Sequence, residues 1–253
     1  MQQCILLSHV FIHNGEKDKI DKVEFALKHW RQFNPDAYIV VTGHGAQPNI
    51  EQYCDHIIWP SQIIQKDINV GHPHLVSLGL EYIQRKGFDY VLKSRCDTVH
   101  NLENVFVFAQ DQLEDKKMLV TQQTSLTQQS LGDLFNFSKV DLMKKIFNVD
   151  QWYPTKTGLT SLANNFLAQC DQSTWKDACL HNLKLIDICK LKWIDFRRNW
   201  QELKDKQHAM LSNNLDDEHN YYWGVKEKWH VWDESGKCIH KLPHIVIEEE
   251  WYR

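Results

Sequence analysis

A charged segment, residues 93–97 (KSRCD), directly follows the apolar run at residues 90–92 (YVL). This pattern predicts a buried strand over residues 90–94 that ends at the edge of a sheet. Residues two apart share a face of a strand, so Lys93 and Arg95 are expected on one side of it. In open α/β sheets, ligands bind outside the carboxyl ends of the strands. Asp97 there, beside two cationic side chains, has the chemistry to hold a divalent cation together with a diphosphate.

Each of these residues also has a purely structural interpretation. Asp97 would cap a strand-to-helix turn, with Asn101 opening the next helix. Lys93 would form a buried ion pair with a carboxylate on a helix instead of supporting the site. Arg95 would either reach a ligand or brace Asp97 through a bidentate pair. Cys96 is expected to point the other way, into the core.

Alternating strands and helices are predicted to position this segment. Apolar residues at helical spacing predict helices over residues 17–33 and 73–86, and apolar runs predict strands over residues 4–12, 37–42 and 56–59. Such alternation is typical of a mostly parallel α/β sheet covered by helices. Right-handed crossovers then bring the carboxyl ends of the strands to one edge.

Three more candidates are expected at that edge. Ser8 and His9 lie near the end of the first strand, and Thr42 ends the second. Small hydroxyl side chains there would suit the base and ribose of a nucleotide, although each is also an ordinary residue for a strand end. Further along, helices are predicted over residues 101–115, 139–148 and 158–170, and strands over 118–121 and 134–138.

Four passages carry a family resemblance: residues 33–42 (FNPDAYIVVT), 69–80 (NVGHPHLVSLGL), 90–98 (YVLKSRCDT) and 131–137 (LGDLFNF). In this order they resemble the WavE-type lipopolysaccharide-synthesis glycosyltransferases. The resemblance implies a GT-A-like single α/β domain that takes a nucleotide-diphosphate sugar as donor and a glycan, of cell-surface polysaccharide or lipopolysaccharide type, as acceptor. It also implies Mn²⁺ or Mg²⁺ as cofactor.

Regular alternation fades after about residue 150. We therefore expect a nucleotide-sugar-binding α/β half over residues 1–150. Residues 151–253 would form a helical and irregular acceptor side, packed with the first half as one domain.

Sugar transfer would require a base for the acceptor hydroxyl and a metal shell for the diphosphate. Asp133, at the start of an apolar strand, is one candidate base, and it is otherwise a turn residue. Asp217 is the other, with Asp216 and Glu218 as rivals. For the metal, the resemblance implies Asp97 together with a C-terminal residue, His219 or else His244.

Composition excludes several classes. The chain has 253 residues, 42% of them hydrophobic, and a net charge of −4, which gives no general attraction to nucleic acid or anionic lipid. Walker A, G-x-G-x-x-G, G-x-S-x-G and H-E-x-x-H motifs are absent from the sequence. Seven scattered cysteines without a C-x-x-C pair predict reduced thiols. Since the sequence shows neither a signal-peptide pattern nor an apolar run of membrane-spanning length, we expect a cytoplasmic protein. It could lie at the inner face of a membrane, or in the host cytoplasm if viral.

Other functions remain open at this point. A basic patch at Lys190, Lys192, Arg197 and Arg198 keeps nucleic acid as a second partner class, with transfer to a modified DNA base as the alternative reaction. A non-catalytic nucleotide- or sugar-binding module is a further alternative. A nucleotidyltransferase would need a Gly-rich phosphate loop near the N-terminus, and residues 8–11 (SHVF) do not form one.

Overall fold

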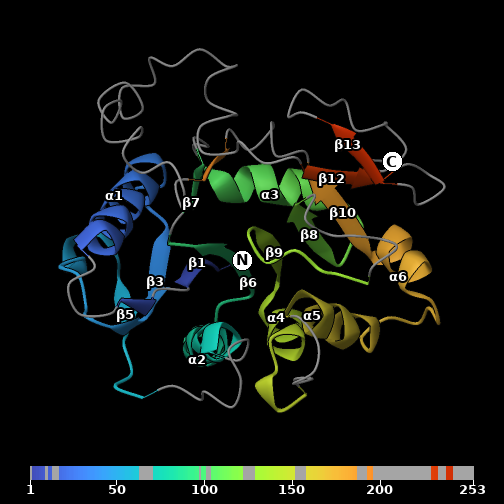
Figure 1. Ribbon diagram of the computed structural model, residues 1–253, viewed down its shortest axis with the longest axis horizontal. Helices are drawn as coiled ribbons and strands as arrows, with labels where there is room; N and C mark the ends of the chain where they lie inside the picture. Colours follow the sequence, from blue (N-terminus) through green and yellow to red (C-terminus); the bar gives the residue numbers. More distant parts are fainter. Residues whose placement is uncertain are drawn as a thin grey trace.

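One seven-stranded sheet organises the computed structural model (Figure 1). The structure describes residues 2–8, 11–12, 17–62, 71–96, 98–100, 104–121, 129–151, 158–186, 193–195, 229–232 and 238–241. The strand order is β10-β8-β9-β6-β1-β3-β5. These strands are β1 (Gln3–Ser8), β3 (Tyr38–Thr42), β5 (His56–Ile58), β6 (Tyr90–Arg95), β8 (Met118–Thr121), β9 (Asn136–Lys139) and β10 (Leu183–Ile186).

Strand β9 runs against the rest of the sheet. It pairs antiparallel with both β6 and β8, whereas the other neighbours in the sheet pair in parallel. The amino end of β9 therefore lies at the same edge as the carboxyl ends of the other six strands. This edge, called the carboxyl edge below, receives the loop before β9 as well as the ends of β1, β3 and β6.

Helices cover both faces of the sheet (Figure 1). Helices α1 (Lys17–Phe33) and α3 (Val105–Leu113) pack on one face, against residues such as Ile5 and Leu7. Helices α2 (Gly71–Arg85), α4 (Val140–Ile146), α5 (Gly158–Leu167) and α6 (Trp175–Asn182) cover the other, against residues such as Cys4 and Leu6. Because successive β1 side chains alternate between the two faces, one strand contributes to both cores.

Three short strand pairs and two 3₁₀ turns lie outside the main sheet in the described part of the chain. Strand β2 (Phe11–Ile12) pairs with β4 (His44–Gly45), β7 (Thr98–His100) with β11 (Trp193–Asp195), and β12 (Trp229–Trp232) with β13 (Cys238–Lys241). The 3₁₀ turns η1 and η2 span Glu51–Tyr53 and Val149–Gln151. Among the described helices, none combines the length and apolarity needed to cross a membrane.

The predicted α/β architecture with a mostly parallel sheet is confirmed. The helix predicted over residues 17–33 is α1 with the same bounds, and the strand predicted over 118–121 is β8. Strand β10 had not been predicted. It follows α6 directly, so no turn residues mark its start. Its Lys184 is buried and paired with Glu114 at 2.7 Å, and a lysine in the sequence does not indicate a buried strand.

Four cysteines, Cys4, Cys54, Cys170 and Cys179, are free thiols. Cys96 is fully buried, as its place opposite Lys93 and Arg95 predicted. Burial raises the pKa of Cys54 to about 11, so this thiol stays protonated at neutral pH.

Gly79 lets α2 approach the sheet closely. A Cβ atom at this position would lie 2.5 Å from Cδ1 of Leu6 and 3.0 Å from Cγ2 of Thr42. Both neighbours are fully buried, so neither can move away freely. This close contact fixes the height of α2, and thus of its first turn, over the carboxyl edge.

We predict that Gly79→Ala destabilises the protein by about 1–3 kcal/mol through overpacking, although Ala is the better helix former by about 1 kcal/mol. Urea unfolding measures the change, with Glu81→Ala on the exposed side of α2 as the control and an expected change within about 0.5 kcal/mol. A stabilised Gly79→Ala variant would show that the helix and the sheet are not in tight contact.

Candidate functional site

The carboxylate of Asp133 lies among three basic side chains at the carboxyl edge. Its Oδ2 atom is 3.2 Å from Nδ1 of His72, 3.8 Å from Nζ of Lys93 and 3.9 Å from Nη1 of Arg95. Lys93 and Arg95 come from β6, His72 from the first turn of α2, and Asp133 from the loop before β9. Three segments distant in sequence thus bring four residues into one polar cluster, called the Asp133 cluster below.

Side chains hold the backbone of the loop before β9 in place. Its three consecutive carbonyls, at residues 132–134, each accept a hydrogen bond from a buried side chain of β6 or β9. Asn136 donates to the carbonyl of Gly132 at 2.8 Å, Lys93 to that of Asp133, and Ser94 to that of Leu134 at 3.0 Å. The loop is therefore fixed by contacts that water does not reach, and the position of Asp133 follows from them.

Lys93 is the most deeply buried charge in the cluster. Its side chain has no exposed surface, and its ammonium group lies 5.4 Å from the centre of the Phe147 ring. A buried ammonium is costly without an anion beside it, and Asp133 supplies that anion. Burial alone would raise the pKa of Asp133. The charge of Lys93, the His72 hydrogen bond and the charge of Arg95 outweigh it and hold this pKa well below its usual range.

His72 is neutral at physiological pH. Burial, and then the nearby charge of Lys93, lower its pKa to about 4, against the opposing effect of Asp133. An ionised Asp133 can only accept, so we assign the imidazole proton to Nδ1. Nε2 is then an acceptor, 3.3 Å from Oγ of Ser8, and the carbonyl of Ser94 is a longer contact for that hydroxyl at 3.5 Å. The hydroxyl of Ser8, the imidazole and Asp133 therefore form one directed chain of hydrogen bonds.

The structure brings together several residues that the sequence had singled out. Ser8, Lys93, Arg95 and Asp133 all belong to or contact the cluster. Lys93 does form a buried ion pair, but with a loop residue and not with the helix carboxylate considered from the sequence. Thr42 ends β3 at the same edge, with a fully buried hydroxyl that has no hydrogen-bond partner among the described residues.

His72 had not been selected from the sequence. The signal available was its place as the second residue of a helix that follows a strand, since such helices begin at the carboxyl edge. Several sequence candidates lie outside the described residues: His9, Asp97, Asp216, Asp217, Glu218, His219 and His244. Within the described part of the chain, no group of three or more His, Cys, Asp and Glu residues is placed to hold a metal ion.

Comparisons with known proteins find solved structures with a similar fold. No protein-family model matches the chain, and no curated protein sequence matches it. Among similar solved structures is a glycosyltransferase involved in glycosylation of the major capsid of PBCV-1. It has 8% identity and a TM-score of 0.50, and the match covers 82% of this chain and 100% of that one. Another is described as a nucleotide-diphospho-sugar transferase from Desulfovibrio desulfuricans G20, with 10% identity, a TM-score of 0.46 and coverage of 85% and 100%. At these identities the comparison concerns the fold, which is GT-A-like.

The low pKa of His72 predicts a specific pH dependence of stability. The unfolded chain binds a proton at His72 below about pH 6.5, whereas the folded chain does so only near pH 4. Stability from this residue is therefore complete above pH 6.5 and is lost as the pH falls toward 4. Between pH 7 and 4.5 we expect the wild type to lose roughly 2 kcal/mol more unfolding free energy than His72→Asn.

Urea unfolding at both pH values measures this difference. Asn keeps an N–H donor near Asp133 but does not titrate, and His56 and His74, whose pKa values are also lowered, titrate equally in both proteins. An identical loss of stability in the two proteins would mean that His72 is not held neutral.

Proposed function

We propose that this protein is a glycosyltransferase that moves a sugar from a nucleotide-diphosphate donor to a glycan acceptor. The observation that carries the proposal is the Asp133 cluster. It gathers Lys93, Arg95 and the start of α2 at the carboxyl edge of a GT-A-like sheet, where the diphosphate of a donor would lie. The solved structure with a TM-score of 0.50, which is described as a glycosyltransferase, supports the same reaction class through its fold.

Within this proposal the two cations have different tasks. Arg95 keeps 11% of its side chain exposed, so its guanidinium is the group that would contact phosphate or ribose oxygens of the donor. Lys93 is fully buried, so it would not contact the donor itself. It would fix Asp133 in place and add positive potential at the edge. Ser8 and Thr42, with His9, are proposed to contact the nucleoside.

We propose that a divalent cation binds beside Asp97 and not beside Asp133. Asp133 already has Lys93 and Arg95 within 4 Å, so a metal ion beside it would meet two like charges. We propose instead that Asp97, which follows β6 by two residues, binds Mn²⁺ or Mg²⁺ with His219 completing the shell. Such an ion would neutralise the charge that develops on the leaving diphosphate.

Asp133 and Asp217 are the proposed bases for the acceptor hydroxyl. Asp133 is ionised at neutral pH and can accept a proton, but its lowered pKa leaves little driving force for doing so. We therefore assign it first to orienting His72 and holding the two cations, which favours Asp217 as the base.

The acceptor is proposed on the sequence resemblance. Similarity to WavE-type transferases over about residues 33–140 supports a glycan of cell-surface polysaccharide or lipopolysaccharide type. We propose that residues 1–150 bind the donor and that residues 151–253 lie on the acceptor side, with β10 from the second part completing the sheet of the first.

Donor binding gives a direct test. A ligand present at a hundred times its dissociation constant stabilises the folded state by about 2.7 kcal/mol, which corresponds to a rise in Tm of roughly 5 °C for a chain of this length. We predict such a rise with at least one UDP-, GDP- or dTDP-sugar in the presence of Mn²⁺. Arg95→Gln should lose most of this rise, whereas the matched control Arg85→Gln, exposed at the far end of α2, should keep it.

Turnover separates an enzyme from a binding module. Release of the nucleoside diphosphate with Mn²⁺ should be measurable in the wild type and lost in Asp97→Ala. If no nucleotide sugar stabilises the wild type, with or without metal, the proposed function is wrong; stabilisation without turnover would identify a non-catalytic binder.

A further inference from the structure

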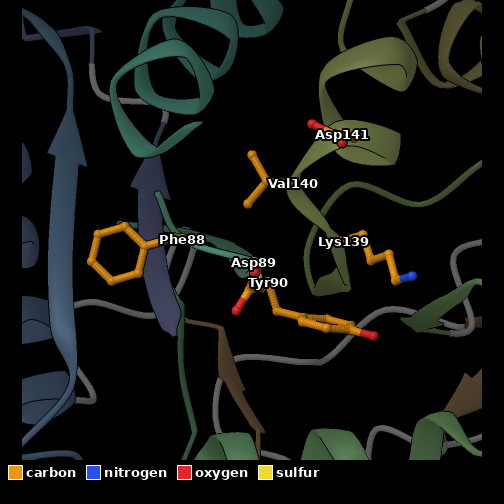
Figure 2. Close-up of a pocket in the computed structure, with 6 residues that line it drawn as sticks. All are labelled: Phe88, Asp89, Tyr90, Lys139, Val140 and Asp141. Carbon is orange, nitrogen blue, oxygen red and sulfur yellow. The ribbon is translucent and has the colours of Figure 1, made fainter. Parts of the chain in front are cut away.

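A pocket of about 530 Å³ lies at the opposite edge of the sheet from the Asp133 cluster (Figure 2). It is formed where β6 begins and where β9 passes into α4. Its lining residues are Phe88, Asp89, Tyr90, Lys139, Val140 and Asp141. Tyr90 and Lys139 face each other across the β6–β9 pair. Arg95, in the cluster, lies five residues along β6 from Tyr90, which is a distance of roughly 16 Å along the strand. The pocket is therefore separate from the proposed donor site.

The pocket combines groups that suit a sugar. Figure 2 shows the rings of Phe88 and Tyr90 directed to opposite sides of Asp89, with Val140 between Asp89 and Asp141. Aromatic rings and an apolar floor offer surfaces for the C–H faces of a pyranose, and carboxylates accept hydrogen bonds from its hydroxyl groups. Both features are needed together, because a sugar presents apolar faces and a polar rim.

Both carboxylates are oriented before any ligand arrives. One oxygen of Asp89 accepts from the backbone N–H of Gln2 at 2.9 Å, and one oxygen of Asp141 accepts from Nε2 of Gln84 at 2.7 Å. Both residues line the pocket, and each carboxylate keeps a second oxygen that can accept a hydrogen bond. Fixing polar groups in this way lowers the entropy that binding must overcome.

A row of part-exposed rings continues from the pocket along the same edge. Phe88 lies 5.0 Å from Tyr38, measured between ring centres, and the hydroxyl of Tyr38 is 2.8 Å from that of Tyr82. Tyr82 in turn stacks on His56 at 3.7 Å with an interplanar angle of 4°. The row runs from the pocket to the start of β5, and Lys86 lies 5.6 Å above the centre of the Tyr82 ring.

We propose that this pocket and ring row form a second, non-catalytic binding site for a neutral oligosaccharide. Two carboxylates and one lysine line the pocket, so its charge disfavours anionic ligands such as nucleotides and phosphorylated sugars. The proposal concerns binding alone and stands whether or not the carboxyl edge transfers a sugar.

Titration calorimetry with the full chain tests it, using maltotetraose, mannotetraose and chitotetraose as neutral probes and tetralysine and pyrophosphate as charged ones. We expect at least one neutral probe to bind with a millimolar or tighter dissociation constant. Phe88→Ala should weaken this binding at least tenfold and Asp141→Asn at least fivefold. The amide that replaces the Asp141 carboxylate keeps an oxygen that can accept from Gln84, so this variant should fold even if the loss of the Phe88 ring unfolds the chain.

Asp171→Asn, at an exposed position distant in sequence from the pocket, is the matched control and should bind like the wild type. Nucleotide-sugar stabilisation should be unchanged in the pocket variants, which distinguishes a failure of this site from a failure of the donor site. The proposal is overturned if no neutral probe binds, if tetralysine or pyrophosphate binds more tightly than every neutral probe, or if Asp141→Asn binds with wild-type affinity.

Discussion

The buried ammonium group of Lys93 is the contact on which the site depends. It bonds to the carbonyl oxygen of Asp133 and neutralises the carboxylate of the same residue, so one side chain fixes both the backbone and the charge of the loop before β9. The antiparallel direction of β9 makes this possible, because it brings that loop to the edge where β6 ends. Without this reversal, the loop before β9 would lie at the other edge of the sheet.

The same ammonium group acts on the protonation of its neighbours. Burial, and then the charge of Lys93, disfavours protonated His72, while that charge favours ionised Asp133 against the effect of burial. The directed chain from the hydroxyl of Ser8 through the imidazole to Asp133 follows from these two states. The first turn of α2 therefore joins the site by hydrogen bonding. The close contact of Gly79 with β1 and β3 determines how near this turn lies to the sheet. Packing on one face of the sheet and chemistry at its edge are thus coupled.

Sequence patterns predicted the elements better than their pairing. The alternation of Lys93 and Arg95 against Cys96, and the convergence of Ser8 with β6, followed from the period of a strand and from right-handed crossovers, and both are confirmed. The direction of β9 could not be predicted, because an apolar run has the same composition in either direction. The role of His72 could not be predicted either, because its neutral state arises from burial and from Lys93, which is distant from it in the sequence. The assignments of Asp97, His9, Asp217 and His219 stay predictions.

The central claim is that Lys93 and Asp133 stabilise each other as a buried pair, and a double-mutant cycle tests it most directly. Urea unfolding of the wild type, Lys93→Met, Asp133→Asn and the double variant gives the coupling free energy. Because each single change removes the nearer ionic partner of a buried charge, and leaves Asp133 with only the contact to Arg95 at 3.9 Å, we expect each to cost roughly 3–5 kcal/mol. The double variant should then cost at least about 2 kcal/mol less than the sum of the two. Additive effects, with a coupling near zero, would contradict the account and remove the basis for the site.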